Sequence, residues 1–192
     1  ITVSRLNQTV VFPAKTMIAA AMNPCKCGFF PDLGKCRCTP TQIRRYLNRV
    51  SGPFLDRIDI GVEVPRQDLG MMAAEKSIDE GSFPQTEQRN SSAVMRARVM
   101  EARDRQEKRF ADESISYNSQ MTRRQIEEHC RLSGEDAVFL EKVERQQGIS
   151  ARGHGKILKV ARTLADLDGQ AEIGRTQLAE AIGFRSFEKK YW

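Results

Sequence analysis

The sequence lacks any run of apolar residues that approaches the roughly 18 residues of a membrane span. It also lacks a signal-peptide pattern. Aromatic residues are few, at 7% of the chain, whereas charged residues make up 29%. That balance predicts helices with solvated faces, and the 40% of hydrophobic residues are enough to build a core. We therefore expect no membrane partner and a cytoplasmic location.

A phosphate-binding loop is also missing. The pattern G-x-x-x-x-G-K-[ST] needs Lys directly after the second glycine and a hydroxyl residue next, to reach phosphate and Mg²⁺. Residues 148–157 are the nearest match, but His154 follows Gly153 and Ile157 follows Lys156. No apolar strand ends in an acidic pair that would hold the metal. The chain by itself is therefore not expected to hydrolyse ATP.

The 192 residues carry a formal net charge of +6 and a sequence pI near 9.2. This length suits one or two small domains. A basic balance is compatible with nucleic acid or nucleotide partners, although +6 spread over this length is weak evidence for them.

Two apolar segments predict strands of an α/β domain. Residues 17–22, MIAAAM, are apolar throughout, as in a strand buried inside a parallel sheet. Its carboxyl end would place Asn23 at the crevice where such sheets bind ligands. An amide there can hold a water or a phosphate oxygen without adding charge. Residues 58–64 alternate between apolar and polar side chains, which predicts a second strand.

Four cysteines form two C-x-C pairs, Cys25 with Cys27 and Cys36 with Cys38, separated by a turn-rich loop. Four thiols from two such knuckles can reach a tetrahedral ion, and four-cysteine coordination is a common structural zinc arrangement. The usual knuckle is C-x-x-C, so C-x-C is a less specific signal. Two disulfides, which a cytosolic chain disfavours, and four reduced cysteines are the alternatives. A zinc ion bound here would be structural, because four protein ligands leave no open position for a water.

Local patterns divide the rest of the chain. Residues 1–14 predict a β-hairpin with its turn around 6–8. Thr39 and Pro40 begin a predicted helix over 41–50. The segment 66–90 lacks periodicity and predicts a linker. Beyond it, serine and threonine caps and apolar periodicity predict a small helical bundle, with helices over 91–110, 122–130, 151–168 and 173–184 and a further one from 133.

Two features of these helices have competing interpretations. Arg44, Arg45 and Arg49 project from the predicted helix 41–50, where nucleic-acid contact competes with a solvated charged face, and the sequence favours the solvated face. Cys130 stands apart from the other cysteines, and we interpret it as a small buried hydrophobic residue rather than a ligand.

The longest motifs are AAMNPCKCG at 20–28, CRCTPTQIRRYLNRVSGPFLDRIDIGVEVP at 36–65 and SARGHGKILKVARTLADLDG at 150–169. In these stretches the chain resembles the magnesium-chelatase-like AAA+ ATPases, co-linearly over nearly its whole length. The resemblance implies the carboxyl-terminal strands of an AAA+ P-loop core, with β-hairpin and cysteine-rich insertions, followed by a helical lid. It also implies that the phosphate loop and the metal-binding strand lie upstream of residue 1.

The same resemblance assigns roles to three residues. Asn23 would be the first sensor, which orients the attacking water or the γ-phosphate. Arg57 would be the arginine finger, which reaches the nucleotide of a neighbouring subunit, and Arg152 the second sensor in a lid helix. The alternatives are a strand-end cap for Asn23 and an exposed helix residue for Arg152. Arg57 stands near Asp56 and Asp59, so its alternative is a surface ion pair.

For the intact protein, the resemblance implies ATP with Mg²⁺ as cofactor and a ring of identical subunits, six in number, that converts hydrolysis into movement on DNA. The expected division is 1–65 for the end of the AAA+ core, 66–90 for the linker and 91–192 for the lid. Arg5 and the hairpin turn would face the central pore and DNA, unless the hairpin is an ordinary edge hairpin. One departure is Gly153 with Gly155, each of which costs a helix up to about 1 kcal/mol and would leave the start of the lid helix mobile.

Two other functions remain open. One is a zinc-bearing nucleic-acid-binding module with no nucleotide role, for which substitution of Arg57 would leave ATP turnover unchanged. The other is a subunit of a metal-inserting chelatase. The cysteine insertion speaks against a chelatase by family analogy alone.

Overall fold

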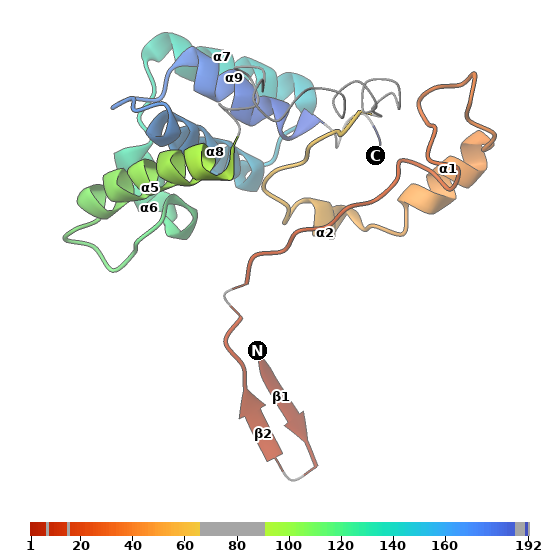
Figure 1. Ribbon diagram of the computed structural model, residues 1–192, viewed down its shortest axis with the longest axis horizontal. Coiled ribbons are helices and arrows are strands. Elements are labelled where there is room, and N and C mark those ends of the chain that lie inside the picture. Colours follow the sequence, from red (N-terminus) through yellow and green to blue (C-terminus); the bar gives the residue numbers. More distant parts are fainter. Residues whose placement is uncertain (7, 15, 66–90, 187–190, 192) are drawn as a thin grey trace, which may run out of the picture. The chain divides into compact units, whose positions relative to one another are not determined.

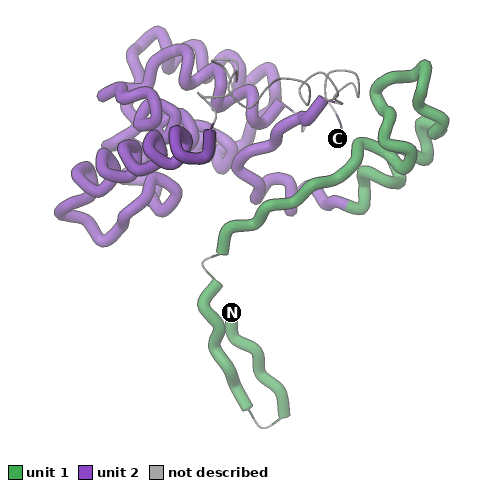
Figure 2. Tube along the Cα trace, in the orientation of Figure 1, with its two compact units in different colours: residues 1–49 green, residues 50–192 purple. Residues whose placement is uncertain are grey.

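The computed structural model describes residues 1–6, 8–14, 16–65, 91–186 and 191. The chain divides into two compact units, residues 1–49 and residues 50–192 (Figure 2). The predicted linker, 66–90, lies outside the described residues. Within the described residues, no helix is both long and apolar enough to span a bilayer.

The first unit begins with a β-hairpin, as predicted. Strand β1 (Thr2–Arg5) pairs antiparallel with β2 (Gln8–Val11), with Thr2 opposite Val11 and Arg5 opposite Gln8 (Figure 1). β-branched residues in both strands favour this extended pairing. Every residue of the two strands is exposed, so the hairpin is held by its ladder and by cross-strand contacts such as Ser4 Oγ to Thr9 Oγ1 at 2.9 Å.

The strand predicted at 17–22 is absent from the structure. These residues have no regular secondary structure and are exposed, Met17 by 94%. A strand buried on both faces needs neighbours on each side to take up its backbone N–H and C=O groups. The described residues contain no strand besides the hairpin pair, so the apolar run has no sheet to join.

The cysteine segment leads into helix α1 (Pro40–Leu47), close to its predicted position. Thr39 caps it in a reciprocal arrangement with Gln42, which satisfies free N–H groups of the first turn. Ile43 and Leu47 are buried on one side of the helix. The other positions are mostly exposed, and the basic side chains of α1, Arg44 and Arg45, therefore face solvent.

The second unit starts with the short helix α2 (Gly52–Leu55), capped by Ser51. The strand predicted at 58–64 is also wrong, because these residues have no regular secondary structure and no strand partner. Alternating side chains alone do not make a strand when no neighbouring strand is present to complete the ladder.

The helical bundle confirms the prediction for the carboxyl-terminal half. Its elements are α5 (Ser92–Arg109), the 3₁₀ turn η1 (Asn118–Gln120), α6 (Arg123–His129), α7 (Gly134–Gln147), α8 (Ala151–Leu167) and α9 (Arg175–Gly183) (Figure 1). The predicted caps are in place on α5, α6, α7 and α8, where the side-chain oxygens of Ser91, Thr122, Ser133 and Ser150 accept from backbone N–H groups.

Helix α8 is the centre of the bundle, and it contacts α5, α6, η1 and α9. Ile157, Ala161 and Ala165 on its inner side are fully buried. Small alanines let the neighbouring helices approach closely, and Ile157 fills the space between them. Leu140 of α7 and Leu178 of α9 complete this buried cluster.

A buried carboxylate, Asp166, joins three elements beneath this core. The guanidinium of Arg109 on α5 makes a two-pronged ion pair with it, and Asn118 Nδ2 donates to it at 2.8 Å from η1. Arg162 lies 3.2 Å away, one turn earlier on α8. Burial lowers the pKa of Arg162, and the Asp166 carboxylate opposes that shift. The network fixes α5 and η1 against α8, because a buried charge is tolerated only with such partners.

Candidate functional site

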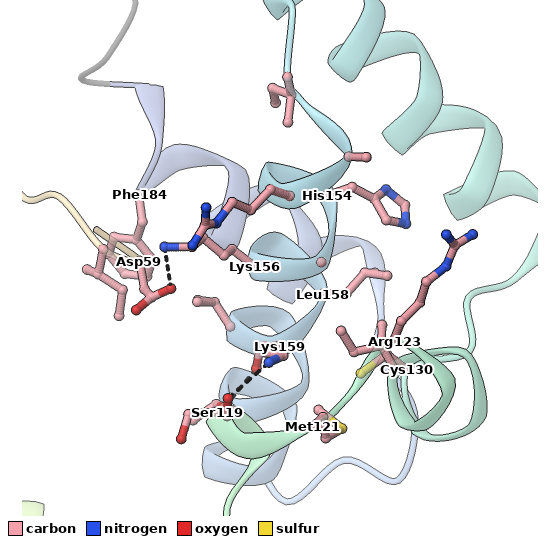
Figure 3. Close-up of a pocket in the computed structure, with 18 of the residues that line it drawn as sticks. Asp59, Ser119, Met121, Arg123, Cys130, His154, Lys156, Leu158, Lys159 and Phe184 are labelled. Atoms are coloured by element: carbon pink, nitrogen blue, oxygen red, sulfur yellow. Dashed lines mark hydrogen bonds and ion pairs between the residues drawn. The ribbon is translucent and has the colours of Figure 1, made fainter. Parts of the chain in front are cut away.

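A groove of about 1220 Å³ runs along α8 within the second unit (Figure 3). One side of α8 contributes Arg152, Lys156, Lys159 and Thr163 to its lining. Their spacing of three or four residues places them on one face of the helix. Carboxylates of Glu127 and Glu144 also line it, together with apolar residues that include Ile60, Met121, Leu158 and Phe184. The groove therefore combines a row of cations with an apolar floor, which suits an anion that carries an apolar or aromatic part.

Arg152 lies in the first turn of α8. Ser150 caps this turn, its Oγ accepting from the Gly153 N–H at 3.1 Å. The side chain of Arg152 is 57% exposed, and its Nε lies 3.7 Å from Asp56 Oδ2. An exposed pair at this distance contributes little to stability. Arg152 is therefore free to exchange its carboxylate partner for another anion at a helix N-terminus, where negative charge is favoured.

Two lysines of α8, Lys156 and Lys159, also line the groove (Figure 3). Lys156 Nζ is 2.9 Å from Asp59 Oδ1, and the lysine side chain is only 13% exposed. Lys159 Nζ donates to the Ser119 carbonyl at 2.9 Å. Burial lowers the pKa of Lys159, because the charged ammonium loses water in the groove. Lys156 thus ties the segment after α2 to α8.

Two hydrogen bonds, one from a side chain and one between backbone groups, hold the same segment on the bundle. Arg185 Nη1 donates to the Ile58 carbonyl, and the Gly61 N–H donates to the Phe184 carbonyl, both at 2.9 Å. Together with the Lys156–Asp59 ion pair, they fix residues 58–61 beside α8 and the end of α9. This segment follows Arg57 directly, so Arg57 lies next to a segment that is held on the helical bundle.

Arg57 itself is exposed. Its Nη1 donates to the Pro53 carbonyl across the short helix α2, and within the described residues it forms no ion pair. Asp56 and Asp59, the partners that a surface ion pair would use, lie instead against Arg152 and Lys156. The guanidinium of Arg57 thus retains donors that face solvent.

Asn23 belongs to the first unit and is also exposed. It follows the irregular run 17–22 rather than the end of a strand. The structure therefore brings Arg57 and Arg152 into one unit, and it describes Asn23 in the other.

Gly153 has a packing role that its helix propensity conceals. A Cβ at this position would lie 2.7 Å from Ile149 Cγ2, closer than side chains pack. At Gly155 the nearest atom would be Ile126 Cδ1, at an ordinary 3.5 Å. The helix nevertheless starts at Ala151 with its cap formed. Gly153 leaves room for the close approach of Ile149, which a larger residue would displace.

The four cysteines of the first unit come together as predicted. One sulfur atom from each of Cys25, Cys27, Cys36 and Cys38 lies within 4.8 Å of the others. The Cys25 and Cys27 sulfurs are 3.3 Å apart, and the Cys27 and Cys36 sulfurs 3.6 Å apart. All four thiols are free, so the two-disulfide alternative is wrong for this structure. The cluster could bind a metal ion through four sulfur ligands.

Backbone N–H groups aim at these sulfurs. The Phe29 N–H lowers the pKa of Cys27 to about 6, against the opposing effect of burial. Burial raises the pKa of Cys25. Backbone hydrogen bonds from Phe30, Phe29 and Cys27 outweigh this effect, so the pKa is lowered overall. For Cys36 the Cys38 N–H lowers the pKa, yet burial and the adjacent thiols raise it to about 11. The pKa is thus lowered at Cys25 and Cys27 and raised at Cys36 and Cys38, so a bound cation would favour the thiolate form of the latter two.

Cys130 behaves as predicted. It ends α6, is buried, and belongs to the core of the bundle. Burial raises the pKa of its thiol to about 11, so it remains protonated and inert.

Comparison with known families identifies the class. Residues 89–185 match the model for the carboxyl-terminal domain of magnesium chelatase subunit ChlI, and residues 1–72 match the model for magnesium chelatase subunit ChlI. The chain belongs to this magnesium-chelatase-like family. Its helices with a small two-stranded sheet are consistent with the carboxyl-terminal domain.

Individual relatives extend over almost the whole chain. The competence protein ComM of Haemophilus influenzae is 40% identical over 187 residues, and the uncharacterized protein YifB of Escherichia coli is 39% identical over 186. An uncharacterized protein of Mycobacterium bovis, Mb2921c, is 30% identical over 185. These matches cover 96–97% of this chain and 34% of each relative. The chain therefore spans about a third of the length of these relatives.

Sequence reasoning missed the residues that hold the site together. The sequence did not predict that Asp56 and Asp59 contact α8, or that Lys156 of α8 binds Asp59. A signal was present, since two acids flank Arg57 while α8 carries cations at intervals of three and four residues. Opposite charges on two segments become evidence of a contact only once the fold brings the segments together.

Substitution by alanine should have opposite effects on stability at the two glycines of α8. Gly155→Ala should raise the free energy of unfolding by about 0.5–1 kcal/mol, because alanine is the better helix former and has room. Gly153→Ala should lower it by about 1 kcal/mol, because displacement of Ile149 outweighs the same gain. Urea unfolding followed by circular dichroism measures both. Equal stabilisation by the two variants would show that the close approach at Gly153 is absent.

Proposed function

We propose that this chain is the carboxyl-terminal part of an AAA+ ATPase that assembles as a ring of six and moves or remodels DNA. The observation that carries the proposal is Arg152, an exposed guanidinium in the first turn of α8, at the end of a groove lined by further cations. A helix N-terminus with an adjacent arginine suits a phosphate group. This is the position expected of a second sensor in the resembled family.

The lining of the groove has the chemical groups that a bound nucleotide would need. Arg152, Lys156 and Thr163 present donors of the kind that phosphates accept, and the apolar floor would suit a base. In the intact protein the nucleotide and Mg²⁺ supply the reactive phosphoanhydride and its charge neutralisation. The part of this chain is to orient the phosphates, with Arg152 exchanging Asp56 for an anion.

Arg57 is the proposed arginine finger. Its guanidinium is exposed, and no carboxylate of the described residues pairs with it. Such a group can reach the nucleotide of a neighbouring subunit and offset the charge that develops in phosphoryl transfer. Docking of residues 58–61 on the lid supports this role, because a finger must be held in place to act in the transition state.

Asn23 is the proposed first sensor, which would orient the attacking water. Its exposure is consistent with that role, since its amide is accessible to a ligand. The proposed division of the chain is the end of the AAA+ core over 1–65, a linker over 66–90 and the lid over 91–192.

The cysteine cluster is proposed to hold a structural zinc ion. Four sulfur ligands are typical of such sites, and N–H groups directed at the sulfurs stabilise the thiolates that zinc requires. Cys25, Cys27, Cys36 and Cys38 would be the ligands, leaving no position for a catalytic water.

The arginine finger can be tested in mixed rings of the intact protein. Arg57→Ala subunits alone should lose ATP turnover by about 10³-fold or more. Subunits without a functional phosphate loop are inactive but still carry Arg57. Mixing the two should restore turnover, because one subunit completes the site of the other. Arg124→Ala, an exposed arginine on α6, is the control and should not change the rate. Full activity of Arg57→Ala rings would instead favour a nucleic-acid-binding module with no nucleotide role.

Metal analysis tests the cysteine site. The freshly purified chain should contain about one zinc ion, and Cys25→Ser with Cys27→Ser should abolish it, whereas Cys130→Ser should retain it. Calorimetry at pH 7 should record proton release on binding, because Cys36, whose pKa is about 11, must lose its proton to become a ligand. Affinity should therefore fall as the pH falls. Less than about half an equivalent of zinc would contradict the site.

A further inference from the structure

The net positive charge of the chain comes from the first unit. Of the 31 lysines and arginines, 8 lie in residues 1–49, where Asp32 is the single acid among the 25 acidic residues. The first unit thus carries +7, and the remaining 23 basic and 24 acidic residues leave the second unit at −1. A zinc ion on four thiolates would still leave the first unit at about +5. The charge is concentrated on 49 residues rather than spread along the chain.

This charge gathers on one side of α1. Arg44, Arg45 and Arg49 line a shallow hollow of about 340 Å³ together with Thr41 and Asn48. We call these five residues the arginine face. All five are exposed, while Ile43 and Leu47 are buried on the other side of the helix. The hollow therefore presents three guanidiniums, an amide and a hydroxyl group, all of which can donate hydrogen bonds.

The arginine face lacks the acids that accompany a solvated charged face. Helix α1 contains no acidic residue, and neither its two arginines, Arg44 and Arg45, nor Arg49 just after it has an ion-pair partner within the described residues. Asp32 is already used by Lys35 at 3.8 Å and by the Gly34 N–H at 3.0 Å. On α5, in contrast, acids are interleaved with arginines, and Arg105 lies 4.0 Å from Glu101. The arginines of α5 therefore form a solvated face on which acids balance their charge. The guanidiniums at α1 have no such counter-charge.

We infer that the arginine face binds the sugar-phosphate backbone of a nucleic acid, without sequence preference. Guanidiniums pair with phosphate oxygens through two hydrogen bonds, and several on one surface match a polymer of phosphates better than a single anion. That this polymer is a nucleic acid, rather than another polyanion, rests on the proposed function.

A membrane surface fits the arginine face less well. A peripheral helix needs large apolar side chains to insert beside its cations. Between residues 24 and 49, Leu33 is the one large hydrophobic side chain that is strongly exposed among the described residues, and it lies on the cysteine loop rather than on α1. Further cations, Lys26, Lys35 and Arg37, are exposed on that same loop. The surface therefore offers charge and hydrogen-bond donors, which suits a phosphate backbone.

The test is binding of mixed-sequence DNA and RNA oligonucleotides to the whole chain without ATP, followed by fluorescence anisotropy at several salt concentrations. The triple variant Arg44→Ala, Arg45→Ala and Arg49→Ala should weaken binding about tenfold or more at low salt. The slope of log affinity against log salt should fall by about 3, one for each lost phosphate contact. Alanine favours a helix, so the variant should fold, and its zinc content and circular dichroism verify this.

The matched control removes the same charge from the second unit, through Arg96→Ala, Arg98→Ala and Arg124→Ala, and should leave the slope unchanged. Arg5→Ala tests the hairpin as the competing surface. Equal weakening by the control triple, loss of binding only in Arg5→Ala, or tighter binding to phosphatidylserine vesicles than to oligonucleotides would each overturn the inference. Competition by free ATP or inorganic phosphate at micromolar concentration would also overturn it, by showing a site for a single anion. Because no nucleotide is present, failure here is distinct from failure of the mixed-ring experiment.

Discussion

The contact of residues 58–61 with α8 and the end of the helical bundle is the constraint on which the proposed site depends. This segment has no regular secondary structure, and it is held by the Lys156–Asp59 ion pair, by a hydrogen bond from the Arg185 side chain and by a backbone hydrogen bond to Phe184, just after α9. Arg57 precedes it, and Arg152 lies at the start of the helix that it contacts. The two arginines therefore share one rigid support, even though they are proposed to act on the nucleotides of different subunits.

That support is rigid because α8 is anchored from within. Ile157, Ala161 and Ala165 are fully buried, and the Asp166 carboxylate binds arginines from α5 and from α8 itself. Removing one member of such a buried network typically costs about 3–5 kcal/mol. In contrast, the contact between Arg152 and Asp56 is long and exposed. The helix thus combines a fixed carboxyl-terminal half with a first turn whose charged partner can be exchanged, which is the property that a phosphate sensor requires.

Prediction from sequence succeeded where the signal was local. Serine and threonine caps and apolar periodicity located the helices of the bundle, because capping and amphipathicity are properties of a few neighbouring residues. The four cysteines were grouped correctly for the same reason. The strands at 17–22 and 58–64 failed, since a strand is completed by partners elsewhere in the chain and the described residues offer none. The packing role of Gly153 was hidden as well, because it depends on Ile149 folding back against the helix start.

The charge of the first unit shows how a sum over the whole chain can conceal a site. A net charge of +6 over the whole chain is a weak signal, yet residues 1–49 carry a net +7 and the rest of the chain a net −1. The arginines of α1 then differ from those of α5 in having no acids beside them. The arginines at α1 therefore belong to a unit with an excess of positive charge, whereas those of α5 lie among acids on a solvated face.

The docked segment is tested most directly by amide hydrogen exchange measured residue by residue in the whole chain. The Gly61 N–H, bonded to the Phe184 carbonyl at 2.9 Å, should exchange at least about tenfold more slowly than the amides of Val62 and Val64 in the exposed part of the same segment. If Gly61 exchanged as fast as these two neighbours, the segment would not be held on the lid. The shared support for Arg57 and Arg152 would then be contradicted.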